Sequence, residues 1–163
     1  MKAPTLISPR LTLRALRKSD APDIARKMAP WGVIKWLSAP PHPYRLVDAH
    51  WFIENQGDGV NWAIATNDAF LGVIRMPALG FWLTEAHQGR GYMTEAARTV
   101  LKWHFGQSSD TVLTGHMIGN HASRAVLLKL GFADTHIAKE FAEPLGDEVQ
   151  MQRMALTATA WDV

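Results

Sequence analysis

The sequence predicts an α/β domain of the α+β type. The predicted elements follow the order strand, two helices, three strands, helix, strand, helix and two strands, which fits neither a doubly wound nor an all-antiparallel domain. The length of 163 residues is close to the most common domain size and allows one substantial core. We therefore expect residues 1–163 to form one domain without internal repeats.

The N-terminal half is predicted to contain a strand, two helices and a three-stranded meander. Asn67-Asp68 and Pro77 mark the two turns of the meander, because these residue types favour turns between strands. A proline-rich connection separates the two helices. The predicted ranges are Leu11–Leu16, Ala21–Met28, Val47–Glu54, Asn61–Thr66, Phe70–Met76 and Leu79–Thr84.

The C-terminal half is predicted to contain two helices separated by a strand, followed by two closing strands. The first helix begins after a glycine-rich turn, and the second begins after the N-cap residue Asn120 and ends at Gly131. Apolar residues recur at helical spacing in the second helix. The predicted ranges are Tyr92–Phe105, Thr111–Met117, Ala122–Leu130, Thr135–Phe141 and Val149–Leu156.

The segment His87–Ala96 joins a predicted strand to a predicted helix and is typical of an anion-binding turn. Gly89 and Gly91 lack the Cβ atoms that would keep a phosphate from the backbone, and they permit positive φ angles that direct N–H groups inward. The following helix adds its unpaired N–H groups and the positive end of its dipole. Because Arg90 adds a positive charge, the turn is a candidate pyrophosphate site.

Spacing excludes two better-known phosphate motifs, while a purely structural turn stays open. A Walker loop requires Gly-Lys-Ser/Thr, and the dinucleotide fingerprint requires Gly or Ala where this chain has Thr94. Glycines that serve the backbone geometry of an ordinary strand-to-helix turn would look the same.

A second segment makes a family resemblance specific. Gln88-x-x-Gly91 with Tyr92-x-Thr94-Glu95-Ala96, followed by Asn120-x-x-Ser123 and Lys129-x-Gly131-Phe132, resembles the two acetyl-CoA motifs of the GNAT acetyltransferase superfamily. The chain is most similar to the branch typified by the ribosomal-protein N-acetyltransferases RimJ and RimL. The resemblance continues through Pro9–Arg14 near one end and Leu156–Thr157 with Trp161 near the other, so it covers essentially the whole chain.

The resemblance implies the GNAT fold and its cosubstrate, acetyl-CoA. In that fold a mixed, mostly antiparallel sheet of about seven strands carries four flanking helices. Its fourth and fifth strands, here Leu79–Thr84 and Thr111–Met117, splay apart around acetyl-CoA. The pantetheine arm is expected on the fourth strand and the pyrophosphate on the glycine turn. The residues expected to contact acetyl-CoA are Phe81, Trp82, Leu83, Gln88, Gly89, Arg90, Gly91, Tyr92, Met93, Thr94, Asn120 and Ser123.

The chain departs from the family pattern at two positions. Met93 stands where the family usually has Gly or Ala; its side chain either crowds the pyrophosphate or points into the core, and we expect the core. Many members carry a tyrosine that protonates the departing thiolate, and this chain has Leu127 there, which cannot donate. The serine of Asn-x-x-Ser has been proposed for this role in the branch, so Ser123 is the candidate donor.

His116 is the candidate general base, because it ends a strand that should border the acetyl site and an imidazole titrates near neutrality. Each of these residues could instead have a structural role. His116 could be part of the packing, Asn120 could serve only as an N-cap, and the Ser123 hydroxyl could donate to a backbone carbonyl of its own helix. Water could also remove the ammonium proton, in which case no dedicated base exists.

The composition excludes several function classes. The absence of cysteine excludes disulfides, thiolate zinc sites and an acyl-cysteine intermediate, so direct transfer remains and no metal is expected. The formal net charge is only +2 and the basic residues are scattered, so no nucleic-acid partner is expected. We expect a cytoplasmic location and no membrane contact, because neither a spanning run nor a signal peptide is visible.

The sequence therefore predicts an acetyl-CoA-dependent N-acetyltransferase acting on a primary amine, a protein N-terminus or a small molecule, in a ternary complex. The alternatives are a catalytically weak GNAT-like domain that senses CoA, a nucleic-acid module and an interaction domain without a ligand. Acceptor specificity is expected in Met28–Val47 and Ala142–Glu148, where the sequence carries least pattern. The acceptor and a homodimer both stay open.

Overall fold

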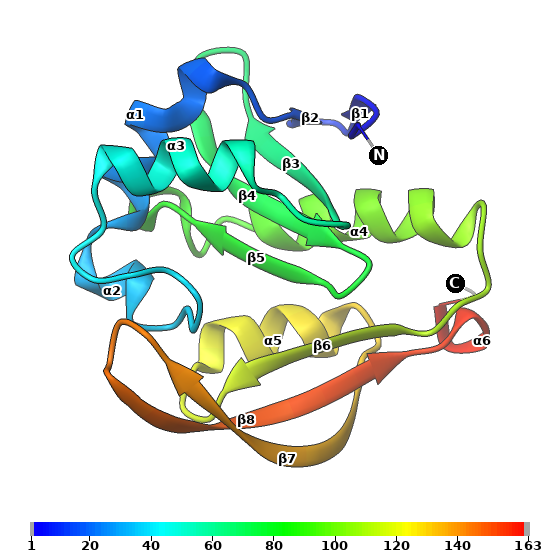
Figure 1. Cartoon of the computed structure of the whole chain (residues 1–163). Coiled ribbons are helices and arrows are strands. Elements are labelled where there is room, and N and C mark those ends of the chain that lie inside the picture. The colour runs from blue at the N-terminus through cyan, green and yellow to red at the C-terminus, as the bar shows by residue number, and fades with distance from the viewer. Residues whose placement is uncertain (1, 162–163) are drawn as a thin grey trace.

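The strands of the computed structural model, which describes residues 2–161, form two sheets (Figure 1). The first has the strand order β1-β2-β3-β4-β5 and the second β6-β8-β7, and neighbouring strands within each sheet are antiparallel. The bounds are Leu6–Ile7 (β1), Thr12–Ala15 (β2), Val60–Ala65 (β3), Phe70–Met76 (β4), Gly80–Leu83 (β5), Val112–Met117 (β6), Ala133–Ala142 (β7) and Asp147–Leu156 (β8).

Helices cover both faces of the first sheet, with α1, α2 and α3 on one side and α4 on the other (Figure 1). Within residues 2–161, no helix combines the length and apolar character needed to cross a membrane. The helices are Ala21–Met28 (α1), Trp31–Ile34 (α2), Leu46–Glu54 (α3), Tyr92–Phe105 (α4), His121–Lys129 (α5) and Ala158–Trp161 (α6), with 3-10 turns at Lys18–Asp20 and Glu85–His87.

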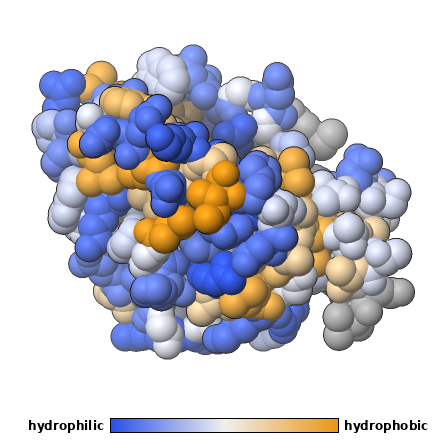
Figure 2. Space-filling view, turned by 90° about the horizontal axis from the view of Figure 1, so that it is seen from below, coloured by the Kyte–Doolittle hydropathy of each residue, from blue (hydrophilic) through white to orange (hydrophobic). Residues whose placement is uncertain are grey.

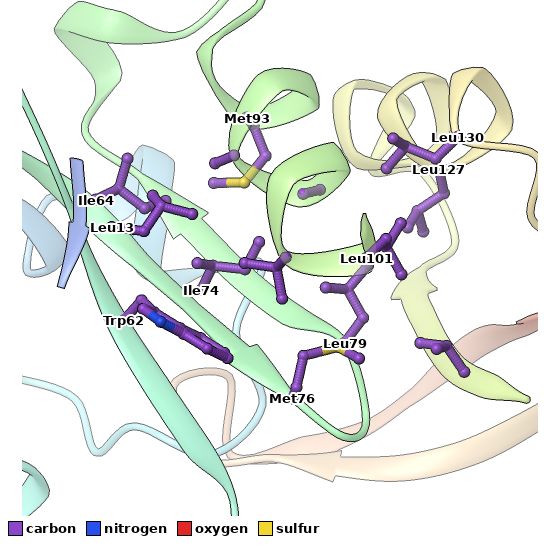
Figure 3. Close-up of a cluster of buried hydrophobic side chains, with 14 of the residues drawn as sticks. Leu13, Trp62, Ile64, Ile74, Met76, Leu79, Met93, Leu101, Leu127 and Leu130 are labelled. Atoms are coloured by element: carbon purple, nitrogen blue, oxygen red, sulfur yellow. The ribbon is translucent and has the colours of Figure 1, made fainter. Parts of the chain in front are cut away.

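The larger core lies between the first sheet and α4 (Figure 3). Trp62 of β3 and Ile74 of β4 point toward α4, which contributes Leu101, and α5 contributes Leu127. All four side chains are fully buried, and burial of each large apolar side chain contributes about 1.5–3 kcal/mol. The same strands turn other residues, such as Ala63, toward a second core under α1, α2 and α3. Burial on both faces of β3 and β4 gives β5 a rigid support.

The predicted elements are all present, and three short ones were missed. The bounds of α1, α4 and β4 match the prediction, and the other predicted elements differ by a few residues at their ends. The chain adds β1, α2 and α6, which are too short, at two or four residues, to show a period. β7 and β8 are longer than predicted. The prediction stopped short because most of the added residues are polar or exposed, so the apolar pattern does not extend to them.

The predicted single sheet is divided in two between β5 and β6. The two strands begin side by side: the Leu79 N–H donates to the Leu113 carbonyl at 2.9 Å, and the Thr114 hydroxyl donates to the Leu79 carbonyl at 2.7 Å. Both strands run in the same direction in Figure 1, and within residues 2–161 no ladder of strand pairing joins them. The splay expected between the fourth and fifth predicted strands is therefore confirmed, and it separates the sheets.

Candidate active site

A cleft of about 500 Å³ lies where β5 and β6 diverge. Its walls come from β5, the turn before α4, the first turn of α4, one side of α5, the end of β6, Met151 of β8, and the segment that contains and follows α2. This volume is within the range of small-molecule sites. The geometry thus brings the glycine-rich turn and the Asn120–Ser123 segment, which lie far apart in the sequence, to one cavity.

The glycine-rich turn has the backbone that the sequence predicts. Gly89 has a φ of 74° and Gly91 a φ of 77°, both in the left-handed region that favours glycine. Gly91 is the N-cap of α4, so the first N–H groups of this 14-residue helix begin at the turn. The Gln88 side-chain amide donates to the Leu83 carbonyl at 2.9 Å, which ties the turn to β5.

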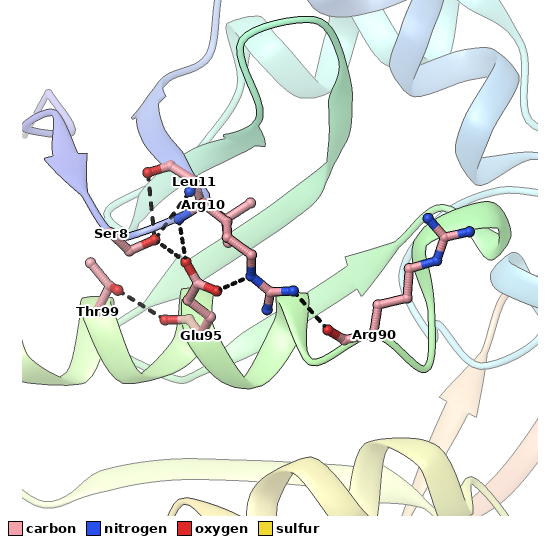
Figure 4. A network of polar contacts seen from close by, with 6 residues as sticks. All are labelled: Ser8, Arg10, Leu11, Arg90, Glu95 and Thr99. Carbon is pink, nitrogen blue, oxygen red and sulfur yellow. Dashed lines mark hydrogen bonds and ion pairs between the residues drawn. The ribbon is translucent and has the colours of Figure 1, made fainter.

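A network from the N-terminal segment holds the turn from outside the cleft (Figure 4). Glu95 accepts hydrogen bonds from the Ser8 hydroxyl at 2.6 Å, the Arg10 N–H at 2.9 Å and the Arg10 Nε at 2.6 Å. Arg10 also donates from Nη1 to the Arg90 carbonyl at 3.0 Å, and its guanidinium lies 4.3 Å from the centre of the Tyr92 ring. Arg10 therefore links the carboxylate on α4 to the backbone of the turn.

The charge of Glu95 is stabilised by this network. Burial by itself would raise the pKa of Glu95, but the hydrogen bonds from Ser8 and Arg10 outweigh it and hold the pKa below its ordinary value. Glu95 stands in the quoted motif, yet its partner lies 85 residues away, so the sequence showed the residue but not its role.

The structure places two predicted residues of the turn. Met93 is only 6% exposed and packs in the larger core (Figure 3), as expected, so its side chain does not fill the space over the glycines. The Arg90 side chain is exposed and is not among the residues that line the cleft, so its contact with acetyl-CoA stays a prediction. Arg90 lies between two positive-φ glycines on the outer side of the turn, where its carbonyl faces Arg10.

The start of α5 presents Asn120 and Ser123 to the cleft. The Asn120 side chain accepts from the Ser123 N–H at 3.2 Å, so it does act as the N-cap. In the part of the chain that the structure describes, the Ser123 hydroxyl forms no bond back to a carbonyl, unlike the Thr99 hydroxyl, which donates to the Glu95 carbonyl at 2.9 Å. Leu127 is fully buried in the core. The Ser123 hydroxyl is therefore available to a ligand.

His116 lines the cleft, but both of its ring nitrogens face protein groups. It is 6% exposed; Nδ1 lies 2.9 Å from the Met117 carbonyl, to which only a protonated Nδ1 can donate. Nε2 lies 3.4 Å from Arg124, whose guanidinium also makes a two-bond pair with Asp134 at 2.8 and 2.9 Å. The geometry gives His116 a structural connection, and its role as a base stays a prediction.

Most predicted contact residues line one cavity. From the predicted set these are Phe81, Trp82, Leu83, Gln88, Gly89, Gly91, Tyr92, Met93, Thr94, His116, Asn120 and Ser123. The sequence did not single out several other wall residues, among them His87, Trp36, Ser38 and Met151. These reach the cleft through loops or through the second sheet, and no spacing rule links such positions.

His87, the first residue of the predicted anion-binding segment, also lines the cleft. Its Nδ1 is buried and has no hydrogen-bond partner among residues 2–161. Burial lowers the pKa of His87 below its ordinary value, and the nearby charges of Arg90 and Lys27 lower it further. A neutral imidazole therefore faces the cavity beside the turn. No group of three or more potential metal-ligating side chains lies together within residues 2–161.

Known proteins share both the sequence pattern and the fold. Residues 10–133 match the family described as Acetyltransferase (GNAT) domain. The Probable N-acetyltransferase YjcK of Bacillus subtilis (strain 168) is 36% identical over 70 residues, which are 42% of this chain and 39% of YjcK. The chain thus matches well under half the length of that relative.

Two solved structures have nearly the same backbone. RimL, the ribosomal L7/L12 alpha-N-protein acetyltransferase in complex with coenzyme A, has a TM-score of 0.83 at 20% identity, covering 96% of this chain and 99% of RimL. The ribosomal-protein-S5-alanine acetyltransferase of Vibrio fischeri has a TM-score of 0.79 at 16% identity, covering 99% and 100%. These likenesses show the fold, and the family match over residues 10–133 shows the ancestry: the chain belongs to the GNAT acetyltransferase domain family.

Proposed function

We propose that the chain is an acetyl-CoA-dependent N-acetyltransferase that transfers the acetyl group directly to a primary amine. The observation that carries this proposal is the cleft between β5 and β6, which contains a glycine turn at the start of α4 and, on α5, a serine hydroxyl without a hydrogen-bond partner within residues 2–161. A cavity of this form can hold an extended ligand with an anionic end and a reactive end.

The residues present fit acetyl-CoA. The backbone N–H groups from Gly89 to Thr94 would receive the pyrophosphate, because a positive-φ glycine turn followed by a helix N-terminus concentrates unpaired donors. β5 is the edge strand of its sheet, so it offers backbone groups to the pantetheine arm along its open side. The structure of RimL contains coenzyme A, which supports the same ligand class here.

In direct acyl transfer, the main task of the protein is to position the amine against the thioester. The amine nitrogen forms a bond to the thioester carbonyl carbon, the carbon–sulfur bond breaks, the amine loses a proton and the thiolate gains one. Ser123 would donate a hydrogen bond to the departing thiolate, or give it a proton and regain one from water, since its hydroxyl is unpaired within residues 2–161 and its backbone is fixed by Asn120. We propose water as the acceptor of the amine proton, because the Nε2 of His116 faces the Arg124 guanidinium.

A CoA-release assay with primary amines tests the proposal against a CoA sensor without turnover. We expect saturable CoA release that requires an amine, and initial-rate lines that intersect, as a ternary complex requires. Acetyl-CoA binding without CoA release from any amine would favour the sensor. Parallel lines together with an acetylated enzyme, seen by mass spectrometry without acceptor, would contradict direct transfer.

Two classes of acceptor fit the proposed reaction. The two similar structures carry names that specify ribosomal proteins as substrates, so a protein N-terminus is one candidate acceptor. A small-molecule amine is the other. The rate constant kcat/KM for the acceptor should rise with pH until the amine is deprotonated, because only the neutral amine attacks.

A further inference from the structure

A second cavity shares a wall with the cleft. Its volume is about 500 Å³, and Trp36 lines both cavities. We call this second cavity the side pocket. Six of its lining residues have apolar side chains: Trp31, Trp36, Met117, Ile118, Leu145 and Val149.

The side pocket leaves large apolar side chains in contact with solvent. Trp31 is 46% exposed, Ile118 49% and Leu145 42%. The face seen from below in Figure 2, over the second sheet, likewise shows hydrophobic residues in groups divided by hydrophilic ones. Apolar groups around a concave space of this size are typical of a ligand site, because a ligand would remove them from water.

The side pocket continues the cleft at the strand ends. Met117 of β6 is paired with the cleft residue Met151 of β8, and Val149 precedes Met151 by two positions, which places it on the same face of that strand. A ligand in the side pocket would therefore lie next to the cavity in which the thioester is proposed. Since Trp36 separates the two spaces, one molecule could extend around this side chain into both.

The side pocket also unites the two segments in which acceptor specificity was expected. Trp31 and Trp36 come from Met28–Val47, and Leu145 comes from Ala142–Glu148. The segments are joined directly, because the Glu143 N–H donates to the Ser38 carbonyl at 2.9 Å. Trp31 packs on the His42 ring with the ring centres 5.1 Å apart, so the proline-rich connection supports this wall.

A positive charge lies at the side pocket. Lys35 is one of its lining residues, and its Nζ lies 5.1 Å from the centre of the Trp36 ring. Among residues 2–161, Lys35 forms no salt bridge. Its charge would repel a second ammonium group on a ligand, so the chemistry of the pocket suits an apolar group and disfavours a polyamine.

We propose that the side pocket binds the body of the acceptor, and that the preferred acceptors are primary amines with an aromatic or branched aliphatic group and no second positive charge. The proposal rests on the proposed N-acetyltransferase function and names its substrate class. For a peptide acceptor it means a large apolar side chain at the first residue.

Matched amines test the preference. We expect kcat/KM, calculated for the neutral amine, to be about tenfold or more higher for phenethylamine than for ethylamine, because burial of an added apolar group commonly changes discrimination by this factor. Putrescine, which carries a second ammonium group, should be a poor acceptor, and Lys35→Gln should improve it. Equal kcat/KM values for phenethylamine and ethylamine in the parent would overturn the proposal.

Two tryptophan variants separate the pocket from general effects on the fold. Trp31→Ala should raise the KM for phenethylamine about tenfold and leave ethylamine nearly unchanged, because truncating Trp31 removes a wall that only the phenyl group reaches. Trp51→Ala is the control: Trp51 is 65% exposed on α3 and lines neither cavity, so both amines should behave as with the parent. Equal losses for both amines in Trp31→Ala would contradict the proposal.

A direct binding measurement shows whether the pocket assignment or the proposed N-acetyltransferase function is wrong. Calorimetry on the CoA-saturated protein should show phenethylamine binding that Trp31→Ala weakens. If no amine releases CoA but this binding is present, the proposed function fails and the pocket stands. If amines are acetylated but Trp31→Ala does not weaken phenethylamine binding, the pocket assignment is wrong. A dimer in sedimentation that Trp31→Ala dissociates would assign the surface to a second copy instead and overturn the proposal.

Discussion

The proposed cofactor site and the side pocket are built by different means. On the cofactor side, the turn around Gly89 and Gly91 is defined by backbone conformation, an N-cap position and the link from Arg10 to Glu95. On the acceptor side, the side pocket is lined mainly by apolar side chains brought together from a four-residue helix and the residues after it, a hairpin and two strand ends. A site made of backbone requires particular residues at fixed spacing and leaves a motif. A pocket made of side chains requires only that the residues be apolar, so it leaves no motif in the sequence.

The largest loss of acetyl-CoA affinity is expected from a substitution in the glycine turn, where the backbone has positive φ angles. Gly91→Asp should weaken acetyl-CoA binding about 100-fold, because a carboxylate beside the pyrophosphate adds like-charge repulsion. It would also place a side chain at a φ of 77°, where the nearest group is Arg10 at 3.4 Å from the added Cβ. Calorimetric titration with acetyl-CoA measures the affinity.

Gly57→Asp is the matched control for this variant. Gly57 has a φ of 66° and nothing within 4 Å of an added Cβ, so the substitution carries a similar backbone cost away from the cleft. We expect Gly57→Asp to bind acetyl-CoA like the parent. If Gly91→Asp also bound like the parent, the turn would not be the pyrophosphate site.

The next effect separates chemistry from binding on the same side of the cleft. Ser123→Ala should lower kcat on the order of 10-fold or more and leave acetyl-CoA affinity nearly unchanged, since the hydroxyl acts on the departing thiolate. The cap on α5 uses the Ser123 backbone N–H, which the variant keeps. A matching loss of affinity would make Ser123 a binding residue, and an unchanged kcat with chemistry rate-limiting would remove it from the mechanism.

A smaller effect tests whether the turn depends on support from outside. Arg10→Gln should raise the Kd for acetyl-CoA about fivefold to tenfold, because the Arg90 carbonyl loses the guanidinium donor, Glu95 loses one of its three donors, and the turn must then be ordered on binding. Arg10→Lys keeps the charge but cannot reproduce the forked contacts, so most of the loss should remain. Arg26→Gln, which removes an equal charge from a side chain 74% exposed on α1, is the control.

An unchanged Kd in Arg10→Gln, with Arg26→Gln also unchanged, would show that the glycines alone hold the turn. That result would narrow the cofactor site to residues 88–94. It would also leave the Glu95 network as a contribution to stability only.

The sequence predicts the fold and the backbone conformation of the glycine turn well, for identifiable reasons. Strand β4 and helices α1 and α4 have the predicted bounds; turn residues mark β4 at both ends, Asn67-Asp68 before it and Pro77 after it, and the glycine turn marks the start of α4. The positive φ of Gly89 and Gly91 followed from residue type. The pairing of Arg10 with Glu95 was not predictable, because nothing local relates positions 85 residues apart. The side pocket escaped prediction because Trp31 and Leu145 meet only through tertiary packing.

The contribution of the Glu95 network to thermal stability should depend on pH, whereas the contribution of apolar packing in the side pocket should not. The folded pKa of Glu95 is lowered, so its contribution to stability is present above its unfolded pKa and disappears as pH falls through the folded value. Glu95→Gln should therefore lower Tm by about 3 °C near neutral pH, and the difference from the parent should shrink on acidification. Thermal unfolding between about pH 3 and pH 7 checks this, with pH values spanning the ordinary range of Glu. A difference that does not change with pH would contradict the charged network.

The smallest effect is expected at His116. Because Nδ1 faces the Met117 carbonyl and Nε2 faces Arg124, His116→Gln should leave the pH profile of kcat/KM unchanged in shape. Disappearance of an ionisation near neutrality would instead establish His116 as the base.

Backbone amide NMR during a titration with acetyl-CoA tests the central claim most directly, because it observes the proposed cofactor site and the side pocket in one experiment. The account predicts large, saturable shifts for the amides of Gly89–Thr94 and along β5, together with small shifts for Trp31, Ile118 and Leu145 until an apolar amine is added. A protein saturated with acetyl-CoA whose Gly89–Thr94 amides do not shift would contradict the assignment of the cofactor site.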